Sequence, residues 1–288
     1  MRLKQIMHSR LVTVLGVAVA VAVPAVTLPR MPHVTLWPVV LGLLPWIVGK
    51  YVLCPLRWHA LTASDLTRWW HIRAYAEAEL LGLFTPGHVG ADLWRLRRLN
   101  RAGLNGADAL TSVGLDRLVG AIGLAAFVGF AGTTLPLRML LVAFGVALLA
   151  VVAALVLRRV RPDLMPRQPL PRPRVLAHAL LLSAGYQMSI AALLLGSVAA
   201  TGHEVSPLAL LGAFGASQLA GAVPGPNGAS PRDAALVVAL AALGVPWAAA
   251  AAAVTLKAVV AWLPALLLGG VSLIVTRWAV RRSVLVPA

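Results

Sequence analysis

Long apolar runs, separated by short breaks that contain arginine and proline, constrain the fold of this chain more than any other feature. A helix needs about 20 mostly apolar residues to cross a bilayer. Only 12% of the residues are charged, against about a quarter in an ordinary soluble domain. We therefore predict an all-α, polytopic membrane helix bundle, with residues 1–288 as one integral membrane domain of about six full spans. The predicted spans are Leu11–Leu28, Val34–Leu53, Ala109–Ala131, Leu137–Leu157, Leu176–Ala200 and Trp247–Val275.

The first run also has the shape of a signal peptide. Arg2, Lys4 and Arg10 precede Leu11–Leu28, as basic residues precede the apolar core of a secretory leader. The run is long for such a core, and the rest of the chain is equally apolar. We interpret it as an uncleaved first span.

Two further apolar regions, near residues 75–95 and 207–243, are interrupted. The first is broken at Pro86-Gly87 and the second at Pro224-Gly225. Proline and glycine free backbone groups that lipid cannot satisfy, so such breaks persist only where protein or a water-filled cavity covers them. We predict two broken or re-entrant segments; the alternative is a helix-breaking loop at the surface.

Arginines at the ends of the apolar runs account for most of the net charge of +16. Cytoplasmic loops of membrane proteins carry an excess of lysine and arginine. We therefore expect cytoplasmic N- and C-termini and a cytoplasmic Arg/Pro-rich loop at residues 158–174. A nucleic-acid partner is not expected, because the arginines do not form the basic groove that a solvated phosphate backbone needs.

Metal and cofactor chemistry have little support in the sequence. Cys54 is the only cysteine, and the seven histidines show no paired spacing. We expect no metal site and no cofactor, and Cys54 is interpreted as a small buried apolar residue.

The two interrupted regions share a motif. Residues 86–91 and 224–229 both read Pro-Gly-x-x-Gly-Ala. Asp116 and Lys257 then follow Gly103 and Gly244 at the same spacing. The charge rule places the first region on the cytoplasmic side and the second outside, which predicts an inverted repeat of the kind that surrounds midplane transport sites. The candidate hinge residues are Pro86, Gly87, Gly90, Pro224, Gly225 and Gly228.

Several charges lie where lipid would otherwise be. A charge at the bilayer centre costs about 2.5–3.5 kcal/mol on insertion scales, so it should face the protein interior and have a partner. We predict that Asp116 and Lys257 approach within salt-bridge or water-bridge range, because they occupy matching places in the repeat. Arg95 and its neighbours are interpreted as topology and headgroup anchors. The candidate substrate or transport residues are Glu79, Asp92, Asp116, Arg117, Arg232, Asp233 and Lys257.

Two stretches carry a resemblance to a known family. Residues 86–92 read Pro-Gly-x-x-Gly-x-Asp, and residues 112–118 read Ser-Val-x-Leu-Asp-Arg-Leu. Residues 223–228, followed by Arg232-Asp233-Ala234-Ala235-Leu236, complete the pattern. Together they resemble the transmembrane, flippase-like domain of lysylphosphatidylglycerol synthases, which also occurs alone. The family tends to have glutamate where Asp116 and Asp233 stand.

The resemblance implies lipid translocation. We expect a flippase or transporter of a polar-headgroup lipid or lipid-linked substrate in the cytoplasmic membrane, with membrane lipids as partners. The sequence shows no soluble aminoacyltransferase domain, so an enzyme is not expected. Two alternatives stay open: a membrane-embedded transferase acting on a lipid phosphate, and a non-transporting partner of a lipid or glycan synthase.

Overall fold

The computed structural model describes residues 34–83, 85, 89–130, 156, 159–160, 171–220 and 230–285. These parts are helical, without a strand. The elements are α3 (Leu36–Val48), η2 (Gly49–Leu53), α4 (Cys54–Leu61), α5 (Arg68–Leu83), α6 (Val89–Arg101), α7 (Gly106–Phe130), α9 (Pro173–Ala199), α10 (Pro207–Ala220), α11 (Pro231–Ala242), α12 (Trp247–Pro264), η5 (Ala265–Gly269) and α13 (Gly270–Leu285). Both η elements are single-turn π-helices that continue the helix on either side.

Four helices in the described residues are long and apolar enough to cross a membrane: Leu36–Leu61, Gly106–Phe127, Pro173–Ala199 and Trp247–Thr276. They agree with four of the predicted spans. The second predicted span is longer than expected, because η2 and α4 extend the helix past Leu53. The predicted spans Leu11–Leu28 and most of Leu137–Leu157, and most of the loop 158–174, lie outside the described residues.

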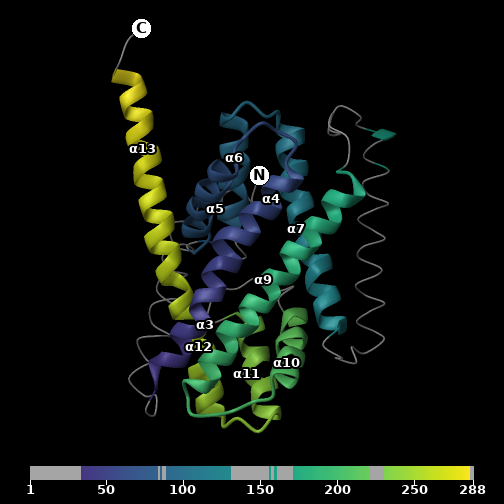
Figure 1. Ribbon diagram of the computed structural model, residues 1–288, viewed down its shortest axis with the longest axis vertical. Helices are drawn as coiled ribbons and strands as arrows, with labels where there is room; N and C mark the ends of the chain where they lie inside the picture. Colours follow the sequence, from purple (N-terminus) through teal and green to yellow (C-terminus); the bar gives the residue numbers. More distant parts are fainter. Residues whose placement is uncertain are drawn as a thin grey trace.

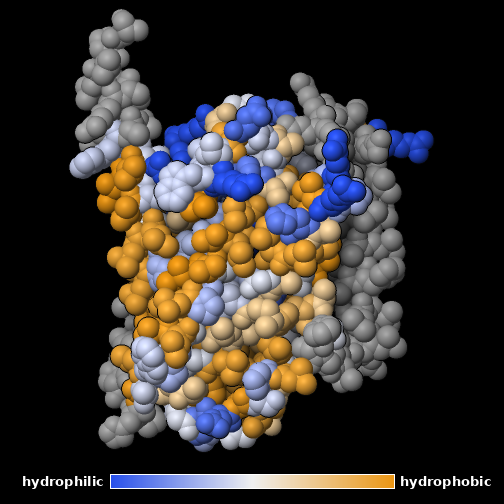
Figure 2. Space-filling view, in the orientation of Figure 1, coloured by the Kyte–Doolittle hydropathy of each residue, from blue (hydrophilic) through white to orange (hydrophobic). Residues whose placement is uncertain are grey.

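The surface is divided between a polar end and an apolar belt. Figure 2 shows hydrophilic residues gathered toward the upper end and hydrophobic residues over the middle. Large apolar side chains are exposed on several long helices, including Leu41 on α3, Leu181 on α9 and Leu267 on η5. Lipid-facing side chains of this kind distinguish a membrane protein from a soluble one, which rarely exposes large contiguous apolar patches. The start of α9, α6 and the far end of α13 lie toward the polar end (Figure 1).

Small residues let α3 and α9 approach closely. A Cβ added at Gly42 would meet the carbonyl oxygen of Ala192, and one at Gly196 would meet that of Pro38. Lipid tails are as apolar as leucine, so membrane helices associate through such close backbone packing rather than through hydrophobic burial. This contact fixes α3 and η2 against α9, and so places Lys50 of η2 opposite Tyr186 of α9.

Two pairs of shorter helices complete the described fold. α5 and α6 lie toward the upper end in Figure 1, and α10 and α11 toward the lower end. α5 ends at Leu83 and α6 begins at Val89, and Gly90 N–H donates to Thr85 Oγ1 near the start of α6 (2.9 Å). An added Cβ at Gly90 would collide with the Thr85 side chain. The other hinge candidates, at positions 86, 87, 224, 225 and 228, lie outside the described residues.

The second helix of each pair ends in the same way. Gly103 (φ 97°) follows α6 and Gly244 (φ 90°) follows α11. Leu104 N–H donates to Leu99 O at the first end, and Val245 N–H donates to Leu240 O at the second. This is a Schellman cap, in which glycine tolerates the left-handed conformation. The two helix pairs therefore share this local feature.

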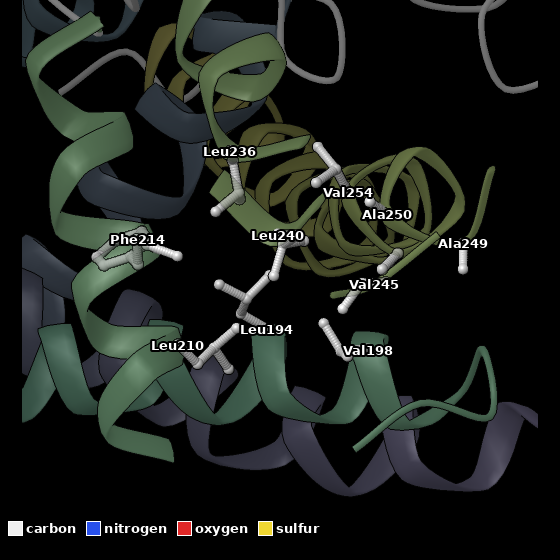
Figure 3. Close-up of a cluster of buried hydrophobic side chains, with 12 residues drawn as sticks. Leu194, Val198, Leu210, Phe214, Leu236, Leu240, Val245, Ala249, Ala250 and Val254 are labelled. Carbon is white, nitrogen blue, oxygen red and sulfur yellow. The ribbon is translucent and has the colours of Figure 1, made fainter. Parts of the chain in front are cut away.

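A buried apolar cluster holds α10 and α11 against the long helices. Figure 3 shows Leu194 of α9, Phe214 of α10, Leu240 of α11 and Val254 of α12 converging. Close packing of this kind gives α10 and α11 a defined position, because protein interiors have little free volume. It leaves the start of α11 beside the middle of α12, where the candidate site lies.

Candidate functional site

A cavity of about 130 Å³ lies where the two helix pairs meet the long helices. Residues from α3, η2, α5, α9, α10, α11, α12 and η5 line it, and it therefore joins segments far apart in the sequence. Its polar lining consists mainly of Lys50, Glu79, Tyr186, Gln218, Arg232, Asp233 and Lys257. Its apolar walls include Trp46, Leu83, Ile190, Phe214, Ala261 and Trp262. Five charged side chains around one small cavity are costly in a membrane protein unless they are paired or used.

Lys50 and Glu79 form the first ion pair of the cavity. Lys50 Nζ lies 3.0 Å from Glu79 Oε2, and both side chains are largely buried. The ammonium also lies 5.7 Å from the centroid of the Tyr75 ring and 5.6 Å from that of Tyr186. Cations are attracted to aromatic faces within about 6 Å. Lys50 is therefore held by one carboxylate and two rings.

The π-helical turn η2 presents Lys50 to the cavity. π-Helical turns inside α-helices are rare and occur frequently at functional sites, since the extra residue redirects the side chains that follow. A Cβ at Gly49 would overlap the side chain of Ser189, so glycine is required there for η2 to approach α9. A second π-helical turn, η5, contributes Ala265 to the same cavity.

Asp233 and Lys257 form the second ion pair. Asp233 Oδ1 lies 3.5 Å from Lys257 Nζ, with both side chains buried. Asp233 also closes a capping box at the start of α11: its backbone N–H donates to Ser230 Oγ (3.2 Å), and Ser230 N–H donates to Asp233 Oδ2 (3.2 Å). The cap fixes the carboxylate and leaves one oxygen toward Lys257.

Two further groups on the cavity wall have spare donors. Arg232, half-buried beside Asp233, forms no ion pair within the described part of the chain. The indole N–H of Trp262 is buried and has no acceptor among the described residues. A buried donor without an acceptor costs about 1–3 kcal/mol, so Trp262 marks the cavity as a place where a ligand oxygen would be stabilised. Arg232 adds a charged donor on the same wall.

A separate buried cluster surrounds Asp116. Its two carboxylate oxygens accept from Arg57 Nε and Arg95 Nη2, each at 2.7 Å. Arg57 also donates to Ser183 Oγ (3.2 Å), and Arg95 stacks 4.3 Å from the centroid of the Trp58 ring. The cluster joins α4, α6, α7 and α9. Because each carboxylate oxygen has a buried cationic partner, the arrangement suits helix locking rather than ligand exchange.

Asp92 and Arg117 form a more exposed pair. Arg117 Nε donates to both carboxylate oxygens (3.1 Å each), and Nη2 donates to Oδ1 (2.9 Å). About half of the Arg117 side chain and a third of the Asp92 side chain are exposed. Asp92 lies in the first turn of α6, as Asp233 does in α11. In both pairs an acid in the first turn of a short helix meets a cation on the long helix that follows it.

Glu77 is the centre of a third buried group. It accepts from Trp94 Nε1 (3.0 Å), Ser272 Oγ (3.0 Å) and Thr276 Oγ1 (2.6 Å), and lies 3.3 Å from Arg98 Nε. These contacts tie α5 to α6 and to α13. The carboxylate is fully buried and has four partners, so its role is structural.

Four of the predicted site residues, Glu79, Arg232, Asp233 and Lys257, line the cavity together. Asp116, Asp92 and Arg117 lie outside its lining, in the two clusters described above. The direct pairing predicted for Asp116 and Lys257 is not formed, because Asp116 pairs with Arg57 and Arg95 while Lys257 pairs with Asp233. Asp116 and Lys257 are therefore each neutralised by a different partner.

Arg95 corrects a second expectation. It is 2% exposed and pairs with Asp116, so it is not a headgroup anchor. Its position among other arginines on α6 concealed this, since only one face of the helix turns inward. Cys54, in contrast, is buried as a free thiol among apolar residues, as expected.

Sequence reasoning missed Lys50, Arg57 and Tyr186. Lys50 is the only charged residue between Arg30 and Arg57, and a lone charge inside an apolar run was the available signal. Tyr186 carries no comparable signal, because an aromatic residue in a span is usually a packing residue. Its role depends on which face of α9 turns to η2.

The fold and this site define an integral membrane protein with a charged cavity between its helices. The chain belongs to the family of the lysylphosphatidylglycerol synthase TM region, which matches residues 9–269. No curated protein and no solved structure matches the chain.

Proposed function

We propose that the protein moves a polar-headgroup lipid, or a lipid-linked substrate, across the cytoplasmic membrane. The observation that carries this proposal is the cavity lined by Lys50, Glu79, Arg232, Asp233 and Lys257 between membrane-crossing helices. Charges in such a place are expensive and mark substrate or ion pathways. The membership in a lipid-related membrane family supports the same substrate class.

The lining matches the two parts of a lipid. Cations and acids lie together on one part of the wall, and apolar side chains such as Trp46, Ile190 and Phe214 form the rest. A headgroup would exchange its water for charge-assisted hydrogen bonds from Lys257 and Arg232, which are about twice as strong as neutral ones. The apolar wall would meet the glycerol and the first methylenes.

In this proposal α5/α6 and α10/α11 are the two re-entrant halves of an inverted repeat. The similar Schellman caps at Gly103 and Gly244 support it, as do the acid–cation pairs Asp92–Arg117 and Asp233–Lys257, each of which joins a short helix to the long helix that follows it. Rocking of one half against the other would open the cavity to alternate sides. The end of the molecule rich in arginine would face the cytoplasm, and the positive-inside rule puts the N- and C-termini on the same side.

The test is headgroup-selective translocation in proteoliposomes. Purified protein is reconstituted with lipids whose headgroups carry a fluorophore, and a membrane-impermeant reductant reports movement between leaflets. We expect protein-dependent movement of at least one headgroup class, with a rate at least tenfold lower in Lys257→Gln. Asp65→Asn, at an exposed loop position, is the matched control and should move lipid as the parent does. Movement of none of the lipids by folded protein would refute the proposal.

A further inference from the structure

The charges of the cavity do not cancel. Among the described residues its lining holds three cations, Lys50, Arg232 and Lys257, and two acids, Glu79 and Asp233, which leaves an excess of one positive charge. Lys50 pairs with Glu79 and Lys257 pairs with Asp233, so the unmatched cation is Arg232. An uncompensated charge in a low-dielectric site is stabilised by a single ligand charge of opposite sign.

Arg232 has the right chemistry for a phosphate. Its planar guanidinium presents several N–H donors in a fixed fork that matches phosphate and carboxylate oxygens. It is the second residue of α11, whose first turn also carries the positive end of the helix dipole. Asp233 and Ser230 satisfy the cap itself, so the added attraction for an anion comes mainly from the side chain.

The cavity of about 130 Å³ has room for a phosphate group. The charges on its wall select the ligand further. An additional ammonium would also meet Lys50 and Lys257, whose carboxylates are already occupied.

We infer that the substrate of this cavity is a lipid with an anionic headgroup, whose phosphodiester is bound by Arg232. This inference rests on the proposed function and specifies its substrate class. A net-cationic headgroup such as lysylphosphatidylglycerol is disfavoured, because it would bring a second positive charge beside an excess cation. Phosphatidylglycerol, with one negative charge, has the required chemistry.

The first experiment measures translocation of three labelled lipids by the same proteoliposomes: phosphatidylglycerol, phosphatidylcholine and lysylphosphatidylglycerol. We expect phosphatidylglycerol to move at least tenfold faster than the other two. Arg232→Gln should abolish that preference, and Arg232→Lys should restore part of it. Arg101→Gln, an exposed arginine of α6, should keep it. Equal rates for the three lipids, or an unchanged preference in Arg232→Gln, would overturn the inference while leaving translocation intact.

A second experiment separates this inference from the proposed function and identifies the source of the phosphate. Radiolabelled phosphatidylglycerol is bound to purified protein in detergent, and unlabelled phosphatidylglycerol or inorganic phosphate is added as competitor. We expect displacement by the lipid at micromolar concentration, none by phosphate at a thousandfold excess, and no binding to Arg232→Gln. Binding with this pattern but without translocation would retain the anion site and refute transport. Displacement by inorganic phosphate alone would overturn the inference. Equal binding of the lipid to the parent protein and to Arg232→Gln would also overturn it.

Discussion

Asp233 at the start of α11 lies 3.5 Å from Lys257 in the middle of α12, and the two side chains neutralise each other inside the protein. The same relationship recurs between Asp92 at the start of α6 and Arg117 of α7. In both cases a carboxylate in the first turn of a short helix meets a cation of the next long helix. The difference is burial: the Asp233–Lys257 pair is enclosed beside the cavity, whereas about half of the Arg117 side chain is exposed.

The enclosed pair predicts strong coupling between its members. Asp233→Asn leaves Lys257 without its counter-charge and should lower stability by about 3–5 kcal/mol, the usual effect of breaking a buried pair. The double variant Asp233→Asn/Lys257→Met should lose less than the sum of the two single variants. Thermal denaturation in detergent, followed by the reaction of a fluorogenic maleimide with the single buried thiol of Cys54, measures this. Additive effects would contradict the pairing.

The Asp116 cluster predicts a structural rather than a transport defect. Asp116→Asn leaves Arg57 and Arg95 buried with weakened partners, and we expect a loss of about 3–5 kcal/mol in stability. Any variant protein that remains folded should keep the lipid preference of the parent, because Asp116 does not line the cavity. A folded Asp116→Asn protein with altered headgroup selectivity would show that the cluster contacts substrate.

The contact between α3 and α9 predicts opposite effects for two Gly→Ala substitutions. Gly196→Ala forces a methyl group against the backbone of Pro38 and should cost about 1–3 kcal/mol, as overpacking does. Gly114→Ala on α7 meets nothing within 4 Å and should be neutral or stabilise by up to about 1 kcal/mol, because alanine is the better helix former. Equal melting temperatures for the two variants would contradict the close helix packing.

His71 predicts a pH dependence of stability. Burial lowers the pKa of His71 to about 4, although its bond to the carbonyl of Thr67 acts in the opposite direction. Nδ1 lies 3.0 Å from Thr67 O, so it carries the proton, and the buried Nε2 has no partner among the described residues. In the unfolded chain the pKa of His71 is near 6.5. The unfolded chain therefore binds a proton at a higher pH than the folded protein does. His71 leaves the stability of the fold unchanged above pH 6.5 and lowers it as the pH falls toward 4.

At pH 5 the loss should be about 2 kcal/mol, since one pKa unit corresponds to about 1.4 kcal/mol. Melting temperatures between pH 7 and pH 4.5 check this. His71→Phe should flatten the profile, and His178→Gln, at an exposed position of α9, should leave it unchanged. A parent profile already flat in this interval would show that His71 accepts a proton in the folded state.

The sequence predicted the helical class and four described spans because the length of an apolar run depends only on composition. It also located the charges that belong inside, since their cost in lipid demands a partner. The sequence did not predict which of these charged residues pair with one another. Which cation meets Asp116 depends on the rotation of α4, α6 and α7 about their axes, and small changes in π-helical turns such as η2 alter that rotation.

In the sequence, an arginine that is buried looks the same as one that sets the membrane topology. Arg95 was therefore interpreted wrongly as a headgroup anchor. Arginines near the end of an apolar run usually anchor a helix at the headgroups. Arg95 lies among three such residues on α6, yet it turns toward Trp58 and Asp116. Lys50, by contrast, could have been predicted as Lys257 was, because both are lone charges within apolar runs.

The central claim is that a lipid headgroup passes through the cavity, and filling that cavity tests it most directly. Ala261 lines the cavity, and Ala126 is exposed on α7. Translocation of fluorescent phosphatidylglycerol is compared for Ala261→Phe and Ala126→Phe, with the Cys54 melting assay confirming that both are folded. We predict that Ala261→Phe loses at least nine-tenths of the rate while Ala126→Phe moves lipid like the parent. An unimpaired rate in folded Ala261→Phe would contradict transport through this cavity.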